Sequence, residues 1–319
     1  MEESPQTIGI IGRGFGLYGY LPAVCELWPH SEVLLPKNSQ DIIKQRPELQ
    51  SFLNGLKIIF VDEISKILRN AEILIIASTP KKQAALIQTL IKDESVIKNL
   101  YLEKPIAPDA RQANSLVHKL VKQNIPFCVG YVMRYTSWFH KLKRFLSEAS
   151  ASDQLLIKWY FKAHHYRKNL KNWKRFSEEG GGAINFYGIH LIAVIAELGQ
   201  YSIFDSTFEK DALGGVSCWR AQFGHTEKPQ IIIDLKSNHD DAYSKFTIHS
   251  SRETKKNLVN LSGPFQEGKD DQRLAQQDRR CKYLLDYLSD NTSGKFFWQG
   301  LTLDCLKLWK DIENKTVVK

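Results

Sequence analysis

Short apolar runs alternate with segments of helical spacing through the first half of the chain. The apolar runs, each of a length that suits a β-strand, stand at 7–11, 32–35, 56–60, 71–77, 98–102 and 125–130. Helical spacing is found at 62–69, 80–92 and 107–123, and Pro80 lies just inside the start of the second of these segments. Strands separated by helices in this order predict an α/β fold with a parallel sheet and right-handed crossovers.

The pattern changes near residue 130. Helical segments at 136–149 and 183–198 flank a strand pattern at 154–163. Alternating segments then follow one another at 203–209, 215–223, 229–237, 244–250 and 257–261, and helical patterns at 270–289 and 297–313 close the chain. Consecutive strands without helices between them predict a mostly antiparallel open sheet. We therefore expect two domains, 1–128 and 129–319, the second of α+β type.

A glycine-rich loop follows the first apolar run directly. It reads Gly12-Arg13-Gly14-Phe15-Gly16 and leads into a helical pattern. This order of strand, glycine turn and helix is typical of Rossmann domains, in which a dinucleotide pyrophosphate lies on the helix N-terminus. Gly12 would permit the tight turn and Gly14 the close backbone approach. The third glycine of G-x-G-x-x-G would fall at position 17, where this chain has Leu17.

A lysine stands where the fifth apolar run ends, in Glu103-Lys104-Pro105. Open α/β sheets place their ligands at the carboxyl ends of strands, which makes Lys104 a candidate catalytic residue. Glu103 can hold the ammonium group, and Pro105 leaves room for a cis peptide bond. The alternative is an ordinary surface pair of charges at a strand end.

Together these motifs resemble the Gfo/Idh/MocA oxidoreductases, the family of glucose-fructose oxidoreductase and inositol dehydrogenase, from about residue 7 to about residue 200. The matching residues are Gly12-Arg13-Gly14-Phe15-Gly16, Ser78-Thr79-Pro80, Glu103-Lys104-Pro105, Tyr131, Arg134-Tyr135 and Gly180-Gly181-Gly182 leading to His190. The resemblance implies cofactor contacts from the glycine loop, from Ser78, Thr79 and Pro80, and from Glu103 and Lys104. It also implies that the second domain binds substrate and forms a homo-oligomer, a dimer or a tetramer.

In this family a lysine and a histidine flank the reacting carbon, and the resemblance assigns these roles to Lys104 and His190. Reduction of a carbonyl needs a proton donor and a group that stabilises the developing alkoxide. Histidine, with its pKa near neutrality, suits the first role and lysine the second. The family usually has an aspartate four residues before this histidine, where the chain has Phe186. Tyr187 is therefore expected to supply the missing polar contact, as a catalytic and substrate-binding residue.

Three functions stay open at this point. The preferred one is an NAD(P)-dependent oxidoreductase acting on a sugar-like carbonyl or alcohol, phosphorylated or nucleotide-linked, with a proton relay through Lys104, His190 and either Tyr187 or Tyr131. A second is a reductase of a C=N or other unsaturated acceptor, with His190 only binding substrate. A third is a catalytically silent NADP-binding regulator on the same fold.

The net charge of +9 arises from 44 basic and 35 acidic residues. Part of the excess lies within 158–175, where basic residues are interleaved with aromatic ones. Such a stretch can bind nucleic acid, clamp an anionic small molecule, or simply be a solvated face. Because it directly precedes the triple glycine and His190, we favour an anionic or sugar-like small molecule over nucleic acid. The expected substrate-binding residues are Tyr131, Arg134, His165, Trp173, Tyr187 and His190.

The end of the second apolar run bears on the choice of cofactor. An acid about 20 residues beyond the glycines would accept the ribose hydroxyls of NAD. Here Val33-Leu34-Leu35 runs into Pro36-Lys37-Asn38-Ser39, which offers a cation and no carboxylate. We therefore expect Lys37, helped by Arg13, to bind the 2′-phosphate of NADP, with NAD as the less favoured cofactor. The alternative is that Lys37 is merely exposed.

Composition adds few restrictions. The chain has no apolar stretch of about 18 residues, and its first residues lack the basic and apolar regions of a signal peptide, so we expect a cytoplasmic protein without a membrane partner. Its five cysteines are far apart and show no C-x-x-C spacing. This spacing argues against a metal site and against a disulfide framework.

Overall fold

The computed structural model describes residues 6–50, 56–92, 96–240, 244–251, 257–266, 280–290 and 293–319. They group into two compact units, each considered by itself. The first draws its residues from 1–106, 115–132 and 269–300, and the second from 107–114, 133–268 and 301–319. The division into a dinucleotide-binding domain 1–128 and a substrate-binding domain 129–319 stays a prediction.

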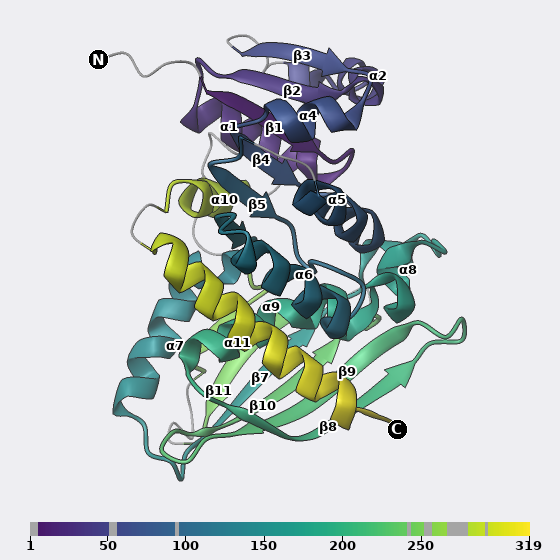
Figure 1. Cartoon of the computed structure of the whole chain (residues 1–319). Coiled ribbons are helices and arrows are strands. Elements are labelled where there is room, and N and C mark those ends of the chain that lie inside the picture. The colour runs from purple at the N-terminus through teal and green to yellow at the C-terminus, as the bar shows by residue number, and fades with distance from the viewer. Residues whose placement is uncertain are drawn as a thin grey trace. The chain divides into compact units, whose positions relative to one another are not determined.

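The first unit contains a six-stranded parallel sheet, which confirms the predicted Rossmann-type fold (Figure 1). Its order is β3-β2-β1-β4-β5-β6, so the chain runs outward from β1 in one direction and then from β4 in the other. The strands are β1 (Thr7–Ile11), β2 (Glu32–Pro36), β3 (Lys57–Val61), β4 (Ile73–Ile76), β5 (Asn99–Leu102) and β6 (Phe127–Val129). The reversal between β1 and β4 is the place where such sheets bind nucleotides.

Helices lie between these strands, and those that follow β3, β4 and β5 are close to the predicted ranges, whereas the two short helices after β2 were not predicted. The helices are α1 (Leu21–Leu27), α2 (Gln40–Lys44), α3 (Pro47–Gln50), α4 (Ile64–Asn70), α5 (Pro80–Lys92), α6 (Ala110–Lys122) and, from a distant part of the sequence, α10 (Cys281–Leu288). Every residue of β4 is buried, as expected of a central parallel strand covered on both faces. Gly9 lets α4 approach β1 closely, because a Cβ there would lie 2.6 Å from Cγ2 of Ile67.

The second unit is built on a seven-stranded mixed sheet of order β12-β11-β7-β10-β9-β8-β13. Its strands are β7 (Gln154–Tyr160), β8 (Ser202–Lys210), β9 (Val216–Gly224), β10 (Gln230–Lys236), β11 (Lys245–Ser250), β12 (Val259–Leu261) and β13 (Val317–Val318). The pairs β7–β10 and β8–β13 are parallel, and the remaining neighbours are antiparallel, as predicted for most of the sheet. Buried residues alternate along β7 and β10, so one sheet face forms the core.

Helices cover that buried face. They include α7 (Ser137–Glu148), the short α8 (His164–Arg167), α9 (Ile189–Leu198) and the C-terminal part of α11 (Gly294–Lys315) (Figure 1). No helix in the described ranges is both long and apolar enough to cross a membrane. The first half of the helix predicted at 270–289 lies outside the described residues, and α10 lies within its second half.

The helix predicted at 183–198 needs a correction. Residues 183–188 form a π-helical turn, η7 (Ala183–Gly188), and only α9 after it is an α-helix. Two glycines accompany this turn: Gly182 begins it at φ +78°, and Gly188 packs where a Cβ would lie 2.8 Å from the Trp219 ring. The apolar pattern alone cannot distinguish such a turn from a regular α-helix.

Candidate active site

The glycine loop joins β1 to the π-helical turn η1 (Gly16–Tyr20), which continues into α1. A Cβ on Gly12 would lie 2.4 Å from the Ala77 carbonyl oxygen, so only glycine fits beside the end of β4. Gly14 is exposed, and the nearest atom to a Cβ there would be 3.9 Å away, on Tyr18. The loop is therefore open where a ligand would approach the backbone, and it fits the pyrophosphate of a dinucleotide.

Ser78, Thr79 and Pro80 lie beside this loop, at the end of β4. The Ser78 hydroxyl donates to the Ile11 carbonyl at 3.2 Å and ties the two strand ends together. Thr79 is exposed, and buried Pro80 begins α5. The structure thus brings the predicted cofactor residues of β1 and β4 to one edge of the sheet.

Lys104 follows β5 at the same edge. Its side chain is only 4% exposed, so it is not an ordinary surface lysine, and the Lys104–Pro105 peptide bond is cis. Glu103 accepts a hydrogen bond from the Tyr20 hydroxyl at 2.9 Å. Burial raises the pKa of the Glu103 carboxyl, although the positive charge of Lys104 opposes this shift. A buried lysine beside a carboxyl group can stabilise a negative charge that develops on a substrate.

Two residues near Glu103 escaped the sequence analysis because they come from distant segments. Tyr20 belongs to the π-helical turn after the glycine loop, and Gly130 leaves room for its hydroxyl, since a Cβ there would lie 3.0 Å from that oxygen. Arg280, just before α10, places its guanidinium 4.1 Å from the ring centroid of Phe15. Its positive charge also lowers the pKa of Glu103, against the larger effect of burial.

Lys37, which we expected to bind the 2′-phosphate of NADP, directly follows β2. Its ammonium lies 2.7 Å from the carboxylate of Asp62, which follows the neighbouring strand β3. Both side chains are more than half exposed, at 64% and 68%. A carboxylate is therefore present near the carboxyl end of β2, where none was found in the sequence, but it belongs to Asp62 after β3.

Tyr131 and Arg134 follow β6. Tyr131 is buried, with its N–H donating to the Val129 carbonyl. Arg134 makes two hydrogen bonds to Glu197 of α9, at 3.0 and 3.3 Å, and a third to the Tyr135 hydroxyl. The guanidinium predicted to bind substrate is thus already held by a carboxylate of its own unit.

His190 lies in the first turn of α9 and is 4% exposed. Its ring meets that of Phe265 edge-on, with centroids 5.6 Å apart. Phe186, predicted to lie one α-helical turn before it, belongs to the π-helical turn and packs edge-on against Trp173 at 5.1 Å. The α-helical count that aligned Phe186 with His190 therefore does not apply.

Asn185 is the polar residue of this turn that the sequence analysis passed over. It is 7% exposed, donates to the carbonyls of Pro108 and Ser177, and accepts from the Trp309 indole at 3.1 Å. An asparagine inside an apolar pattern was the available signal. Its bonds fix the turn that precedes His190.

His165, Trp173 and Tyr187 come together in an aromatic cluster with Trp159, Phe161 and Phe186. His165 is 2% exposed and lies nearly parallel to the Tyr187 ring at 6.3 Å. Its Nε2 has no hydrogen-bond partner among the described residues. Burial lowers the pKa of His165 to about 4, helped by the charges of Lys174 and Arg175. His165 is therefore neutral near pH 7 and can exchange hydrogen bonds with a neutral hydroxyl group.

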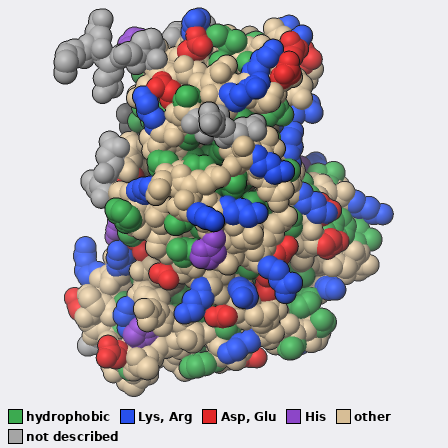
Figure 2. Space-filling view, in the orientation of Figure 1, with side chains coloured by type: hydrophobic (Ala, Val, Ile, Leu, Met, Phe, Trp, Pro, Cys, Tyr) green, Lys and Arg blue, Asp and Glu red, His purple; other side chains and the backbone are tan. Residues whose placement is uncertain are grey.

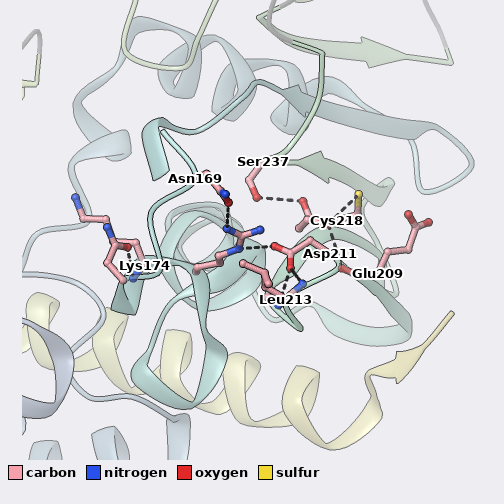
Figure 3. A network of polar contacts seen from close by, with 11 residues as sticks. Asn169, Lys174, Glu209, Asp211, Leu213, Cys218 and Ser237 are labelled. Carbon is pink, nitrogen blue, oxygen red and sulfur yellow. Dashed lines mark hydrogen bonds and ion pairs between the residues drawn. The ribbon is translucent and has the colours of Figure 1, made fainter. Parts of the chain in front are cut away.

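The basic stretch divides into exposed and buried cations. Arg167, Lys168 and Lys171 are exposed, whereas Arg175 is buried in an ion pair with Asp211, with 2.8 Å between Nε and Oδ2 (Figure 3). On the face drawn in Figure 2, Lys and Arg side chains are spread among Asp and Glu. Among the described residues no three His, Cys, Asp or Glu side chains gather in a way that could hold a metal ion.

Lys104 belongs to the first unit, and His190, Tyr187, His165 and Trp173 belong to the second. Each group is assembled within its own unit as described. The pairing of Lys104 with His190 around one substrate, and the other assigned roles, stay predictions.

Comparison with known proteins gives matches of two kinds. Residues 6–131 match the family model described as "Oxidoreductase family, NAD-binding Rossmann fold" (GFO_IDH_MocA). An uncharacterized oxidoreductase of Streptococcus pneumoniae is 24% identical over 103 residues, which are 32% of this chain. The matching part spans only 28% of the length of that relative.

Solved structures of similar fold cover nearly the whole chain. KijD10, a 3-ketoreductase from Actinomadura kijaniata in complex with NADP and TDP-benzene, has a TM-score of 0.69 at 13% identity and covers 99% of both chains. GenD2 from gentamicin A biosynthesis, in complex with NAD, has a TM-score of 0.69 at 12% identity, with 98% of this chain and 96% of that chain covered. A super-repressor mutant of Gal80p from Saccharomyces cerevisiae has 0.68 at 12% identity, with 98% and 95% covered.

At these identities the structures establish the fold alone, and the family model rests on the unit that contains the glycine loop and Lys104. Residues 6–131 thus match the NAD-binding Rossmann-fold domain of the Gfo/Idh/MocA family of oxidoreductases.

Proposed function

We propose that the protein is an NAD(P)-dependent oxidoreductase that transfers a hydride between the nicotinamide and a carbonyl or alcohol of a sugar-like molecule. The observation that carries this proposal is buried Lys104 at the carboxyl end of β5, on the sheet edge that also bears the open glycine loop. A regulator that only binds a cofactor has no need to bury an ammonium group at that edge, because burial of a charge is costly.

The chain's own residues would act as follows. Gly12, Arg13, Gly14, Phe15 and Gly16 would hold the pyrophosphate, and the bound cofactor would supply or accept the hydride. Lys104 would stabilise the alkoxide that develops on the substrate. His190, or Tyr187 beside His165, would give the proton to that oxygen during reduction and remove it during oxidation.

NADP is the cofactor we favour, because Lys37 and Arg13, both exposed, offer positive charges for a 2′-phosphate. Asp62 opposes that choice, since its carboxylate would repel the phosphate. An exposed ion pair contributes little, so the phosphate can replace Asp62 at Lys37. KijD10 was solved with NADP and GenD2 with NAD, so both cofactors occur on this fold.

A sugar-like substrate, phosphorylated or nucleotide-linked, is proposed from the second unit. Its aromatic cluster offers rings for stacking, neutral His165 offers a hydrogen bond, and exposed Arg167, Lys168 and Lys171 offer charges for a phosphate. The complex of KijD10 with TDP-benzene supports this class. We further propose a homo-oligomer, to be checked by sedimentation.

The test is oxidation of NADPH and NADH by the purified protein with a panel of nucleotide-linked keto-sugars, free sugars and imines. Lys104→Ala should lower turnover by about a hundredfold or more, on the scale of losing one aligned donor, while the protein still folds and still binds the cofactor. The matched control is Lys98→Ala, because Lys98 is exposed and pairs with Glu72 just before β5. If the protein bound the cofactor but turned over none of these substrates, a catalytically silent regulator would be the better interpretation. If Lys104→Ala kept nearly full activity, Lys104 would not be catalytic and the proposed mechanism would be wrong.

A further inference from the structure

Gln83 lies beneath the backbone that carries Lys104. It belongs to the first turn of α5, where its N–H donates to the Thr79 carbonyl at 2.8 Å, and its side chain is 0% exposed. Its Nε2 faces the carbonyl oxygens of Glu103 at 2.6 Å, Pro105 at 3.2 Å and Ile106 at 3.3 Å. One amide group thus contacts the chain on both sides of Lys104.

The segment after β5 needs such a donor. Glu103 is the last residue tied to the sheet, through its N–H to the Ile76 carbonyl, and α6 begins only at Ala110. Between them the backbone is irregular and buried, and buried carbonyls without a donor are costly. The amide of Gln83 meets this need from a neighbouring helix.

The orientation of the amide follows from its surroundings. With the groups reversed, Oε1 would face three carbonyl oxygens, which would repel it. In the observed orientation Oε1 is buried without a hydrogen-bond partner among the described residues. Because a buried oxygen without a hydrogen bond is costly, we infer that the hydrogen bonds of Nε2 outweigh the cost of leaving Oε1 without a partner.

We propose that Gln83 is a positioning residue for Lys104, which holds the backbone around it and so sets where the ammonium group lies. The inference rests on the proposed function, in which Lys104 stabilises the substrate oxygen. Displacement of a catalytic group by about 1 Å can cost a hundredfold in rate, so the loss of this support should appear in kcat and not in cofactor affinity.

The experiment is a double-mutant cycle with a second readout. Gln83→Met keeps the size of the side chain and removes the donor, Gln83→Glu keeps the shape, and Gln88→Met on the exposed face of α5 is the matched control. Turnover is measured per NADPH-binding site in the wild type and in Lys104→Ala. The acetylation rate of Lys104 relative to Lys98 is measured by mass spectrometry, which needs no substrate.

We expect Gln83→Met to lower kcat by about tenfold or more in the wild type and by less than about threefold in Lys104→Ala, because a residue that acts through Lys104 has no further effect without it. Lys104 acetylation should change in both Gln83 variants and stay the same in Gln88→Met. The inference would be overturned if Gln83→Met lowered kcat by the same factor in the wild type and in Lys104→Ala, or if the acetylation rate of Lys104 did not change in the Gln83 variants. If acetylation of Lys104 changed in the Gln83 variants but the wild-type protein showed no turnover, Gln83 would still position Lys104 and the proposed oxidoreductase function would be rejected.

Discussion

The ion pair between Arg175 and Asp211 gives a stability prediction whose size follows from its burial. The two side chains are only 7% and 6% exposed. Arg175 also donates to Asn169 at 3.3 Å, and Asp211 accepts the N–H groups of Leu213 at 2.7 Å and Gly215 at 3.1 Å (Figure 3). The pair therefore connects the loop that follows α8 to the turn between β8 and β9.

Asp211→Ala should lower the free energy of unfolding of the second unit by about 3–5 kcal/mol, because it leaves a buried guanidinium without its carboxylate. Asp211→Asn keeps an acceptor but loses the charge, so its cost should be smaller, about 1.5–3 kcal/mol, the range of a hydrogen bond to a charged group. Asp205→Ala is the matched control, since Asp205 lies exposed on β8.

Urea unfolding followed by tryptophan fluorescence measures these differences. Trypsin cleavage at exposed Lys168 and Lys171 adds a local measure, and the Ala variant should be cut faster as the loop opens. If Asp211→Ala were as stable as Asp205→Ala and cleaved no faster, the ion pair would not hold this loop and the reasoning would be refuted.

The pH dependence of this pair has a definite sign. Burial by itself raises the pKa of Asp211, but the hydrogen bonds from Arg175, Leu213 and Gly215 outweigh it and lower the pKa below its ordinary value. A folded-state pKa below the unfolded value means stabilisation that is complete well above about pH 4 and is lost as the pH falls through the folded pKa. The stability gap between wild type and Asp211→Ala should therefore narrow in acid.

Three further expectations concern the cofactor site and two glycines. Lys37→Ala should weaken NADP binding by about tenfold and leave NAD binding unchanged, whereas Asp62→Asn should strengthen NADP binding. Calorimetric titration measures both dissociation constants. If the ratio of the NADP and NAD dissociation constants were the same in the wild type and in both variants, Lys37 would not bind the 2′-phosphate. Gly181→Ala should prevent correct folding of its loop, as judged by thermal denaturation, because a Cβ there would lie 2.0 Å from the Trp173 carbonyl oxygen. Gly300→Ala, where a Cβ on α11 meets nothing within 4 Å, should instead stabilise by about 0.5–1 kcal/mol.

The sheet of the first unit could be predicted because each of its strands has a recognisable local sequence pattern. Apolar runs bounded by turns mark β1 to β6, and helices between them require parallel pairing. The positions of the glycine loop and of Lys104 at strand ends follow from that order. The same argument predicted a mostly antiparallel second sheet from consecutive alternating segments, such as β8, β9 and β10.

The partners of charged residues could not be predicted in this way. Lys37 meets Asp62, and Arg134 meets Glu197, across distances in sequence that only the folded chain closes. The π-helical turn η7 was missed for a related reason. Its apolar pattern suits an α-helix, and the close packing of Gly188 on Trp219 that accompanies the turn is a tertiary contact, which the sequence does not show.

The π-helical turn before His190 also changes which side chains lie on one face of this segment. The Ile189 N–H donates to the carbonyl of Ile184, five residues back, where an α-helix would count four. Such a turn is equivalent to a one-residue insertion in an α-helix, and each α-helical residue corresponds to about 100° of rotation. Side chains before the turn are therefore rotated against those after it. Counting four residues back from His190, as in a regular α-helix, reaches Phe186, whereas counting the five residues of the π-helical interval reaches Asn185.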